Sequence, residues 1–112
     1  AANATKAFLW CACGVILVLL CFGGVGVEIY VSSSVHERHP ELSVEDVLTA
    51  FRSAMQEARR DDGTWMLVGL DGRGRNVEVL YAENHGTIVI YHAFTPPTKK
   101  FLNEMNQLRR QS

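Results

Sequence analysis

The sequence predicts an α+β fold: an apolar N-terminal helix, then a helix, a three-stranded antiparallel meander and a C-terminal helix. Three observations support it: an uncharged run over residues 8–27, helical apolar spacing over 43–60 and 96–109, and three strand-like segments between those two helices. In this order of elements the helices are expected to pack on one face of the sheet. The 112 residues suffice for one domain, and the net charge of −1 supplies no overall basic field for nucleic acid. Phosphate binding therefore requires a local cluster.

The uncharged run at residues 8–27 is long enough to cross the hydrocarbon core of a bilayer as a helix. Three interpretations remain open: a transmembrane or signal anchor, a cleaved signal peptide, or a start assigned too early in front of a soluble domain. All three cysteines lie in this run, so none is left to form a disulfide framework in the remaining chain. We therefore expect an apolar segment over residues 1–27 and a small α+β domain over 28–112.

Residues 28–32, EIYVS, form either a fourth, N-terminal strand or the end of the apolar segment. The strongest helix signal follows at 43–60. Ser43 is a natural N-cap, and Asp46 stands three residues later, where it completes a capping box. Apolar side chains then recur at helical spacing and predict a stripe facing the core, made of Val44, Val47, Leu48, Phe51, Met55 and Ala58.

The antiparallel meander is predicted from three segments, residues 64–70, 75–82 and 87–91. The turns between them, DGRG and NHG, contain glycines that tolerate the positive φ of tight hairpins. The middle segment alternates, which places Val77, Val79 and Tyr81 on one face and Asn76, Glu78 and Leu80 on the other.

The last helix is expected to run from Pro96 to about Arg109, capped by Thr95. Lys99 and Lys100 in its first turn lie beside free backbone N–H groups, which attract anions. Two interpretations remain open for these lysines, a phosphate site or solubilising surface charges.

His92 ends the third strand of the meander, where an imidazole can accept and donate protons near neutral pH. Strict alternation places it on the face of that strand's isoleucines and Tyr91 on the opposite face, unless a bulge or twist intervenes. A packed, hydrogen-bonded core histidine and a catalytic histidine both fit this position. His36 and His39 have loose metal-ligand spacing but no third ligand, so we expect no metal site.

Arginines near the first hairpin offer a further basic group. Arg73 and Arg75 flank its turn, and a planar guanidinium suits phosphate oxygens and a developing negative charge. The alternative for Arg75 is a structural ion pair with Asp71 or Glu78. Arg52 lies on a polar face of the first long helix, which is either solvated or part of a binding surface.

Three stretches of the chain together suggest a family: RHPELSVEDVLTAFRSAM, DGTWMLVGLDGRGRNVEVLYAE and IVIYHAFTPPTKKFLNEM. They contain a histidine lead-in to an acidic helix start, a G-x-G-R hairpin, and a strand that ends in Tyr-His-Ala ahead of Thr-Lys-Lys. In these features residues 36–108 resemble the BrnT-type toxins of bacterial type II toxin–antitoxin pairs, within the RelE-like ribonuclease superfamily.

The resemblance implies an endoribonuclease that cuts RNA without a metal or other cofactor, through attack of the ribose 2′-OH, and that a cognate antitoxin protein neutralises. At matching positions it implies catalytic roles for Arg75, His92, Lys99 and Lys100. We expect RNA contacts from Arg73, Arg52 and Tyr91. The expected location is the cytoplasm, with a membrane anchor if residues 8–27 span a bilayer. The alternative function is a non-enzymatic, membrane-tethered interaction module on the same small sheet.

Overall fold

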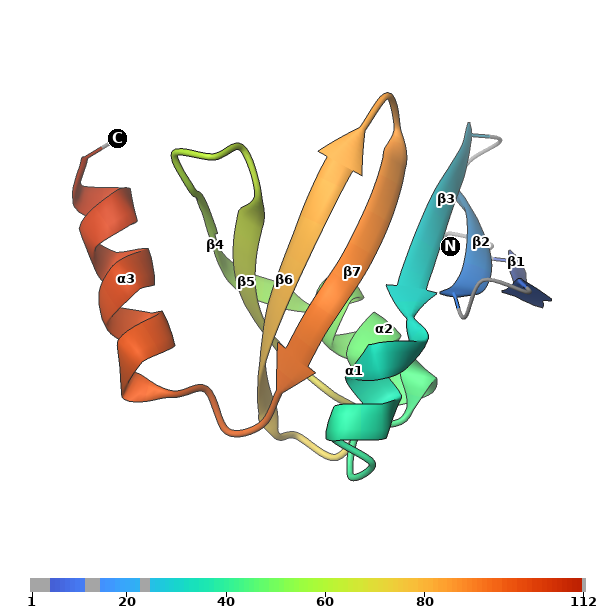
Figure 1. The fold of residues 1–112 in the computed structure, drawn as a ribbon, viewed down its shortest axis with the longest axis horizontal. Helices are drawn as coiled ribbons and strands as arrows, with labels where there is room; N and C mark the ends of the chain where they lie inside the picture. Colours follow the sequence, from blue (N-terminus) through green and yellow to red (C-terminus); the bar gives the residue numbers. More distant parts are fainter. Residues whose placement is uncertain (1–4, 12–14, 23–24, 112) are drawn as a thin grey trace.

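The computed structural model describes residues 5–11, 15–22 and 25–111, and it describes side chains from residue 28 onward apart from residue 36. Within these residues the chain is an α+β fold built on one mixed sheet with the strand order β1-β2-β3-β7-β6-β5-β4 (Figure 1). The strands are β1 (Thr5–Cys11), β2 (Val15–Phe22), β3 (Val25–Ser32), β4 (Ala54–Arg59), β5 (Trp65–Leu70), β6 (Asn76–Asn84) and β7 (Thr87–Phe94). The helices are α1 (Ser33–Arg38), α2 (Val44–Arg52) and α3 (Lys99–Arg110).

Strands occupy the apolar N-terminal run, where a helix over residues 8–27 was expected. β1 pairs antiparallel with β2, and β2 pairs antiparallel with β3, so this run extends the sheet. A continuous apolar segment suits a buried strand as well as a helix, and periodicity alone does not separate the two. Among the described residues, no helix is long and apolar enough to cross a membrane. The expected boundary between residues 27 and 28 falls inside β3.

The meander is present as predicted, and residues 28–32 belong to a strand, which was one of the two alternatives for that segment. β3 lies parallel to β7, with Tyr30 opposite Val89, and β5, β6 and β7 are consecutive antiparallel neighbours. The turn between β5 and β6 closes with a hydrogen bond from the Gly74 N–H to the Asp71 carbonyl, and Gly74 has a φ of +78°. The predicted alternation of β6 is confirmed, because one cluster on one face of the sheet buries Val77, Val79 and Tyr81.

The long helix expected over residues 43–60 ends early. Its start is as predicted: the Ser43 hydroxyl accepts from the Asp46 N–H, and the Asp46 carboxylate accepts from the Ser43 N–H, each at 3.1 Å. The residues of β4 then leave the helix and pair with β5 at the edge of the sheet. The helical spacing of Met55 and Ala58 is therefore coincidental. Met55 is 53% exposed, and Ala58 is buried against α3 instead of against the core under α2.

The apolar side chains that the structure describes form two clusters, one on each face of the sheet. α1 and α2 lie together on one side, and α3 stands apart on the other, beside β4 (Figure 1). The first cluster contains Ile29, Val31, Val35, Leu42, Val47, Leu48, Ala50, Leu67, Val77, Val79, Tyr81, Ile90 and Ala93. The second contains Ala58, Met66, Val68, Phe101 and Met105. The expectation that the helices share one face is therefore wrong. Because α2 already covers the first face, the apolar stripe of α3 is buried against the second.

A close contact at Gly69 fixes α2 on the sheet. A Cβ placed on this glycine would collide with the backbone carbonyl of Ala50, which is fully buried in α2. Only glycine lets the helix backbone approach β5 this closely. The start of α2 is joined to the β5–β6 turn by a separate contact, from Nη2 of Arg75 to the Asp46 carboxylate at 3.4 Å.

Candidate active site

A β-bulge decides where His92 lies. Ile90 is opposite Tyr81 and His92 is opposite Leu80, so Tyr91 is an extra residue on β7. Ile90 is fully buried in the cluster under α1 and α2, whereas His92 contacts Glu78 on the side of α3. The prediction that His92 shares the face of Ile88 and Ile90 is therefore wrong. A bulge adds one residue to the alternation and transfers the histidine to the other face.

Glu78 is the buried carboxylate that positions this histidine. Its side chain is on β6 and the residue is 4% exposed. Oε2 of Glu78 lies 2.8 Å from Nε2 of His92, and Oε1 accepts from the backbone N–H of Thr98 at 2.8 Å. An ionised carboxylate accepts the proton of Nε2, which leaves Nδ1 as the ring nitrogen with a lone pair. Glu78 therefore fixes both the orientation and the tautomer of His92.

The same carboxylate anchors the beginning of α3. Thr98 is the N-cap of this helix, and its hydroxyl accepts from the Phe101 N–H at 3.2 Å. The expected cap, Thr95, lies outside the helix and donates its hydroxyl to the carbonyl of Asn76. The helix consequently starts at Lys99, later than predicted, with both lysines in its first turn.

His92 lines a pocket of about 340 Å³ between the sheet and α3. Its wall consists of Arg60, Glu78, Leu80, His92, Thr98, Lys100, Phe101 and Glu104. The Arg60 guanidinium donates twice to the Glu104 carboxylate, at 2.8 and 3.2 Å, and their charges offset one another. Lys100 lines the pocket without a carboxylate partner among the described residues, so its charge remains available to an anionic ligand.

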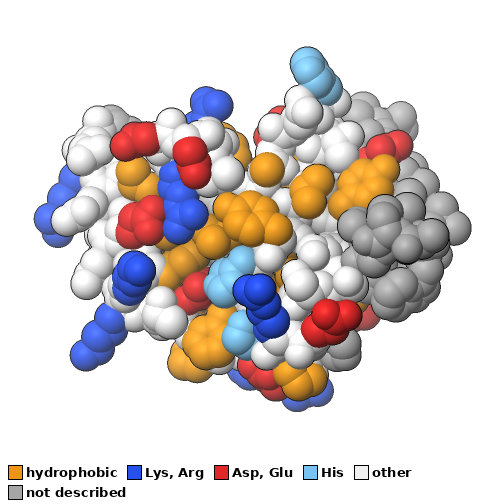
Figure 2. Space-filling view, in the orientation of Figure 1, with side chains coloured by type: hydrophobic (Ala, Val, Ile, Leu, Met, Phe, Trp, Pro, Cys, Tyr) orange, Lys and Arg blue, Asp and Glu red, His pale blue; other side chains and the backbone are white. Residues whose placement is uncertain are grey.

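A second histidine, His39, lies next to His92. The two ring centroids are 6.1 Å apart with the planes at 87°, and the His39 ring packs on Phe94 at 4.7 Å. Nδ1 of His39 is 3.6 Å from a carboxylate oxygen of Glu41. Figure 2 shows histidine side chains near the middle of this face, among apolar side chains and beside a lysine or arginine. Sequence reasoning considered His39 only as a metal ligand.

Arg75, predicted to be catalytic, is bound elsewhere as a structural residue. Its Nε donates to Asp71 at 2.7 Å, and its Nη2 lies 3.4 Å from Asp46 and 3.3 Å from the Glu41 carbonyl. Burial by itself would raise the pKa of Asp71. The backbone and side-chain hydrogen bonds from Arg75, together with the backbone N–H of Arg73, outweigh burial and hold that pKa below its ordinary value.

The remaining predicted site residues separate into those near the pocket and those away from it. Tyr91 is 38% exposed and adjoins His92 on β7. Lys99 is exposed and does not line the pocket, although its neighbour Lys100 does. Arg73 is exposed in the β5–β6 turn, and Arg52 is exposed at the end of α2. The structure thus brings His92 and Lys100 together at one pocket. Tyr91 and Lys99 adjoin them in the chain without lining it, and Arg52, Arg73 and Arg75 do not line it either.

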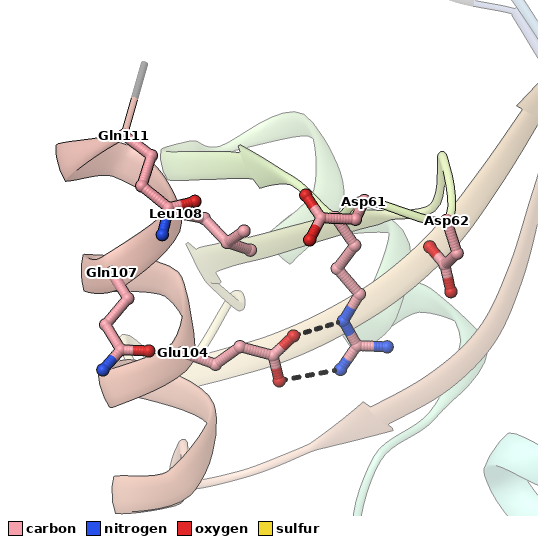
Figure 3. A pocket seen from close by; sticks show the side chains of 7 residues that line it. Asp61, Asp62, Glu104, Gln107, Leu108 and Gln111 are labelled. Atoms are coloured by element: carbon pink, nitrogen blue, oxygen red, sulfur yellow. Dashed lines mark hydrogen bonds and ion pairs between the residues drawn. The ribbon is translucent and has the colours of Figure 1, made fainter.

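A hollow of about 550 Å³, larger than the histidine pocket, shares the Arg60–Glu104 ion pair with it, but the remaining lining residues differ. Figure 3 shows Glu104 extending from α3, with Asp61 and Asp62 on the neighbouring turn and Gln107 further along the helix. Hydrogen bonds from the Thr64 hydroxyl and backbone lower the pKa of Asp62, so this carboxylate stays charged. An acidic lining repels phosphate, which leaves the histidine pocket as the candidate site.

Comparisons with known proteins found no relative: no protein-family model matches the chain, and neither the curated proteins nor the solved structures give a match.

Proposed function

We propose that this protein is a metal-independent endoribonuclease with its active site at the histidine pocket, and that it acts as the toxin of a toxin–antitoxin pair. One observation supports this most directly. The buried carboxylate of Glu78 holds Nε2 of His92 at 2.8 Å, and the ring lines a pocket that also contains Lys100. A histidine oriented by a carboxylate is a competent general base, and a nearby ammonium stabilises the charge of a phosphodiester.

In the proposed reaction, Nδ1 of His92 takes the proton from a ribose 2′-OH. The 2′ oxygen then attacks the adjacent phosphorus, and the bond from phosphorus to the 5′ oxygen breaks. The departing 5′ oxygen takes up one proton, which balances the proton given to His92. The products are a 2′,3′-cyclic phosphate and a 5′-hydroxyl, and no metal or redox partner is consumed in this step. Glu78 stabilises the imidazolium that forms on His92, because its carboxylate is already hydrogen-bonded to the ring.

The test uses the full chain with an end-labelled single-stranded RNA in buffer containing EDTA. His92→Ala is expected to reduce the cleavage rate by about 10²- to 10⁴-fold, the usual contribution of a general acid or base. The matched control is His85→Ala, which removes an exposed histidine from the β6–β7 turn and should leave the rate unchanged. An RNA carrying 2′-O-methyl groups should resist cleavage, because it lacks the attacking hydroxyl.

Toxicity follows the same variants in cells. Induced expression of the full chain is expected to arrest growth, His92→Ala to relieve the arrest, and His85→Ala to preserve it. Cleavage by His92→Ala at the wild-type rate would place the active site elsewhere.

A second candidate function, an interaction module without enzymatic activity, is favoured by one separate observation. Val89 and Tyr91 on β7 are each 38% exposed, and the apolar stripe of α3 packs over Ala58, Met66 and Val68 instead of over them. Such an uncovered part of a sheet suits a protein partner. Absence of both cleavage and growth arrest by the unaltered chain would favour this second function.

A further inference from the structure

His39 is held in place beside His92 by its backbone as well as by its ring. Its N–H donates to the Val35 carbonyl at 3.1 Å, and its own carbonyl accepts from the Leu42 N–H at 2.9 Å. Val35 and Leu42 are both buried in the core under α1 and α2. The ring then packs on Phe94. His39 is thus anchored through both its backbone groups and its ring, even though it lies between two helices.

The position of His39 follows from the sheet topology. β3 pairs with β7 only as far as Val31 and Ile90, and α1 begins directly after β3. The last residues of β7, which include His92 and Phe94, therefore extend past the end of β3. The residue that ends α1 lies beside them, 6.1 Å from the His92 ring.

We propose that His39 is the general acid of the cleavage reaction and protonates the departing 5′ oxygen. This inference rests on the proposed ribonuclease activity and adds a second catalytic residue to it. Each proton-transfer hydrogen bond spans about 2.6–3.2 Å, so one phosphodiester can contact a nitrogen of each of two rings whose centroids are this close. The 2′ proton passes to His92, the 5′ oxygen receives a proton from His39, and the number of protons held by the two histidines is conserved.

The surroundings of the two histidines suit these different roles. The buried carboxylate of Glu78 accepts a hydrogen bond from the Nε2–H of His92, so the lone pair is on the other nitrogen, which is what a base requires. His39 has Glu41 at 3.6 Å on a surface that is partly open, with side-chain exposures of 23% and 44%. The partly open surface gives the departing 5′ oxygen of a bound RNA access to this ring, which a general acid requires.

The decisive experiment compares two substrates of identical sequence, one with the ordinary 5′ oxygen at the cleavage position and one with sulfur in its place. A thiolate leaves without protonation, so the sulfur substrate has no need of a general acid. His39→Ala should slow cleavage of the oxygen substrate by about 100-fold or more and restore nearly wild-type rates with the sulfur substrate. His92→Ala should slow cleavage of both substrates, because both require the 2′-OH to lose its proton.

His39→Gln serves as a second variant, since it keeps a polar side chain of similar reach against Phe94, and circular dichroism verifies the fold of each variant. Equal loss on both substrates would assign His39 a structural role and overturn the inference. Wild-type rates of His39→Ala on the oxygen substrate would overturn it as well, while leaving the ribonuclease activity intact. If the unaltered chain cleaves neither substrate, the ribonuclease proposal fails and this inference fails with it.

Discussion

Asp71 and Glu78 are buried carboxylates only seven residues apart, and each holds one basic side chain. Asp71 also accepts from two backbone N–H groups, and Glu78 accepts from one. Their basic partners nevertheless differ in what remains available. Arg75 has three acceptors, from Asp71, Asp46 and the Glu41 carbonyl. His92 has one carboxylate partner, Glu78, at one ring nitrogen, and the residue lines a pocket. The first pair joins the β5–β6 turn to α2, and the second places an imidazole at the wall of a pocket.

The number of partners around each basic side chain is the basis on which we propose a structural role for Arg75 and a catalytic role for His92. A guanidinium enclosed by three acceptors has little capacity left for a phosphate. An imidazole held on one side keeps its other nitrogen for proton transfer. Residue type alone suggested Arg75 and His92 equally, and only the arrangement of Asp71 and Glu78 distinguishes them.

The largest effect on stability is expected from removing the Asp71–Arg75 ion pair. Asp71→Ala leaves the Arg75 guanidinium and the backbone N–H groups of Arg73 and Arg75 without their buried acceptor. We expect the free energy of unfolding in urea to fall by about 3 kcal/mol. The control, Asp61→Ala, removes an exposed carboxylate from another turn and should change it by about 0.5 kcal/mol or less. A loss for Asp71→Ala no larger than for the control would show that the pair contributes nothing to the fold.

A smaller effect is expected from weakening the Glu78–His92 pair, and it should appear in the reaction rate more than in the stability. Glu78→Gln keeps the shape and a hydrogen bond to His92 but removes the charge that stabilises its imidazolium. We expect kcat to fall about tenfold (~1.4 kcal/mol in the barrier) with KM little changed. The pH–rate profile should also shift, a change that a purely structural glutamate would not produce. A lower KM with an unchanged kcat would contradict the positioning role.

The Asp71–Arg75 pair should also make the stability of the fold depend on pH. The hydrogen bonds from Arg75 and Arg73 hold the pKa of Asp71 in the folded chain below that of the unfolded chain, which is about 3.9. Ionised Asp71 therefore stabilises the fold above about pH 4, and this contribution is lost as the pH falls through the lower, folded value. Urea titrations from pH 6 down to pH 3 should show a steeper loss for the wild type than for Asp71→Asn. Parallel curves would indicate that another carboxylate dominates acid unfolding.

Local patterns predicted those parts of the fold whose contacts are local. The capping box of Ser43 and Asp46, the glycine turns and the alternation of β6 all rest on neighbouring residues, and each is confirmed. β4 could not be predicted in this way. Its sequence, AMQEAR, consists of helix-favouring residues that continue the helical spacing, and only pairing with β5 makes it a strand.

The candidate site was predicted only in part, because some of its contacts are local in the sequence and others are not. His92 and Lys100 stand close in the sequence, and the pocket unites them. The approach of His39 depends on the parallel pairing of β3 with β7, and the face of His92 depends on a bulge next to Tyr91. No local spacing encodes either feature. The partner of Glu78 could not be predicted either. The alternation of β6 gave the face on which Glu78 lies, but it did not show that Arg75 pairs with Asp71 and leaves Glu78 to another partner.

The smallest expected effects separate two adjacent lysines. Lys100 lines the histidine pocket and Lys99 does not, so only Lys100 is placed to contact a phosphate beside His92. Lys100→Ala should weaken binding of a 2′-O-methyl RNA, which cannot be cleaved, by about fivefold (~1 kcal/mol). Lys99→Ala is the matched control, with the same charge removed from the same helix turn, and should alter binding by about twofold or less.

The dependence of binding on salt concentration separates the two lysines more sharply. One lost phosphate contact lowers the slope of log Kd against log salt concentration by about 0.7 for a single strand. That change is expected for Lys100→Ala alone. Equal slopes for the two variants would mean that the RNA senses only the general charge of the helix, and the pocket would then no longer be favoured as the place where the phosphate binds.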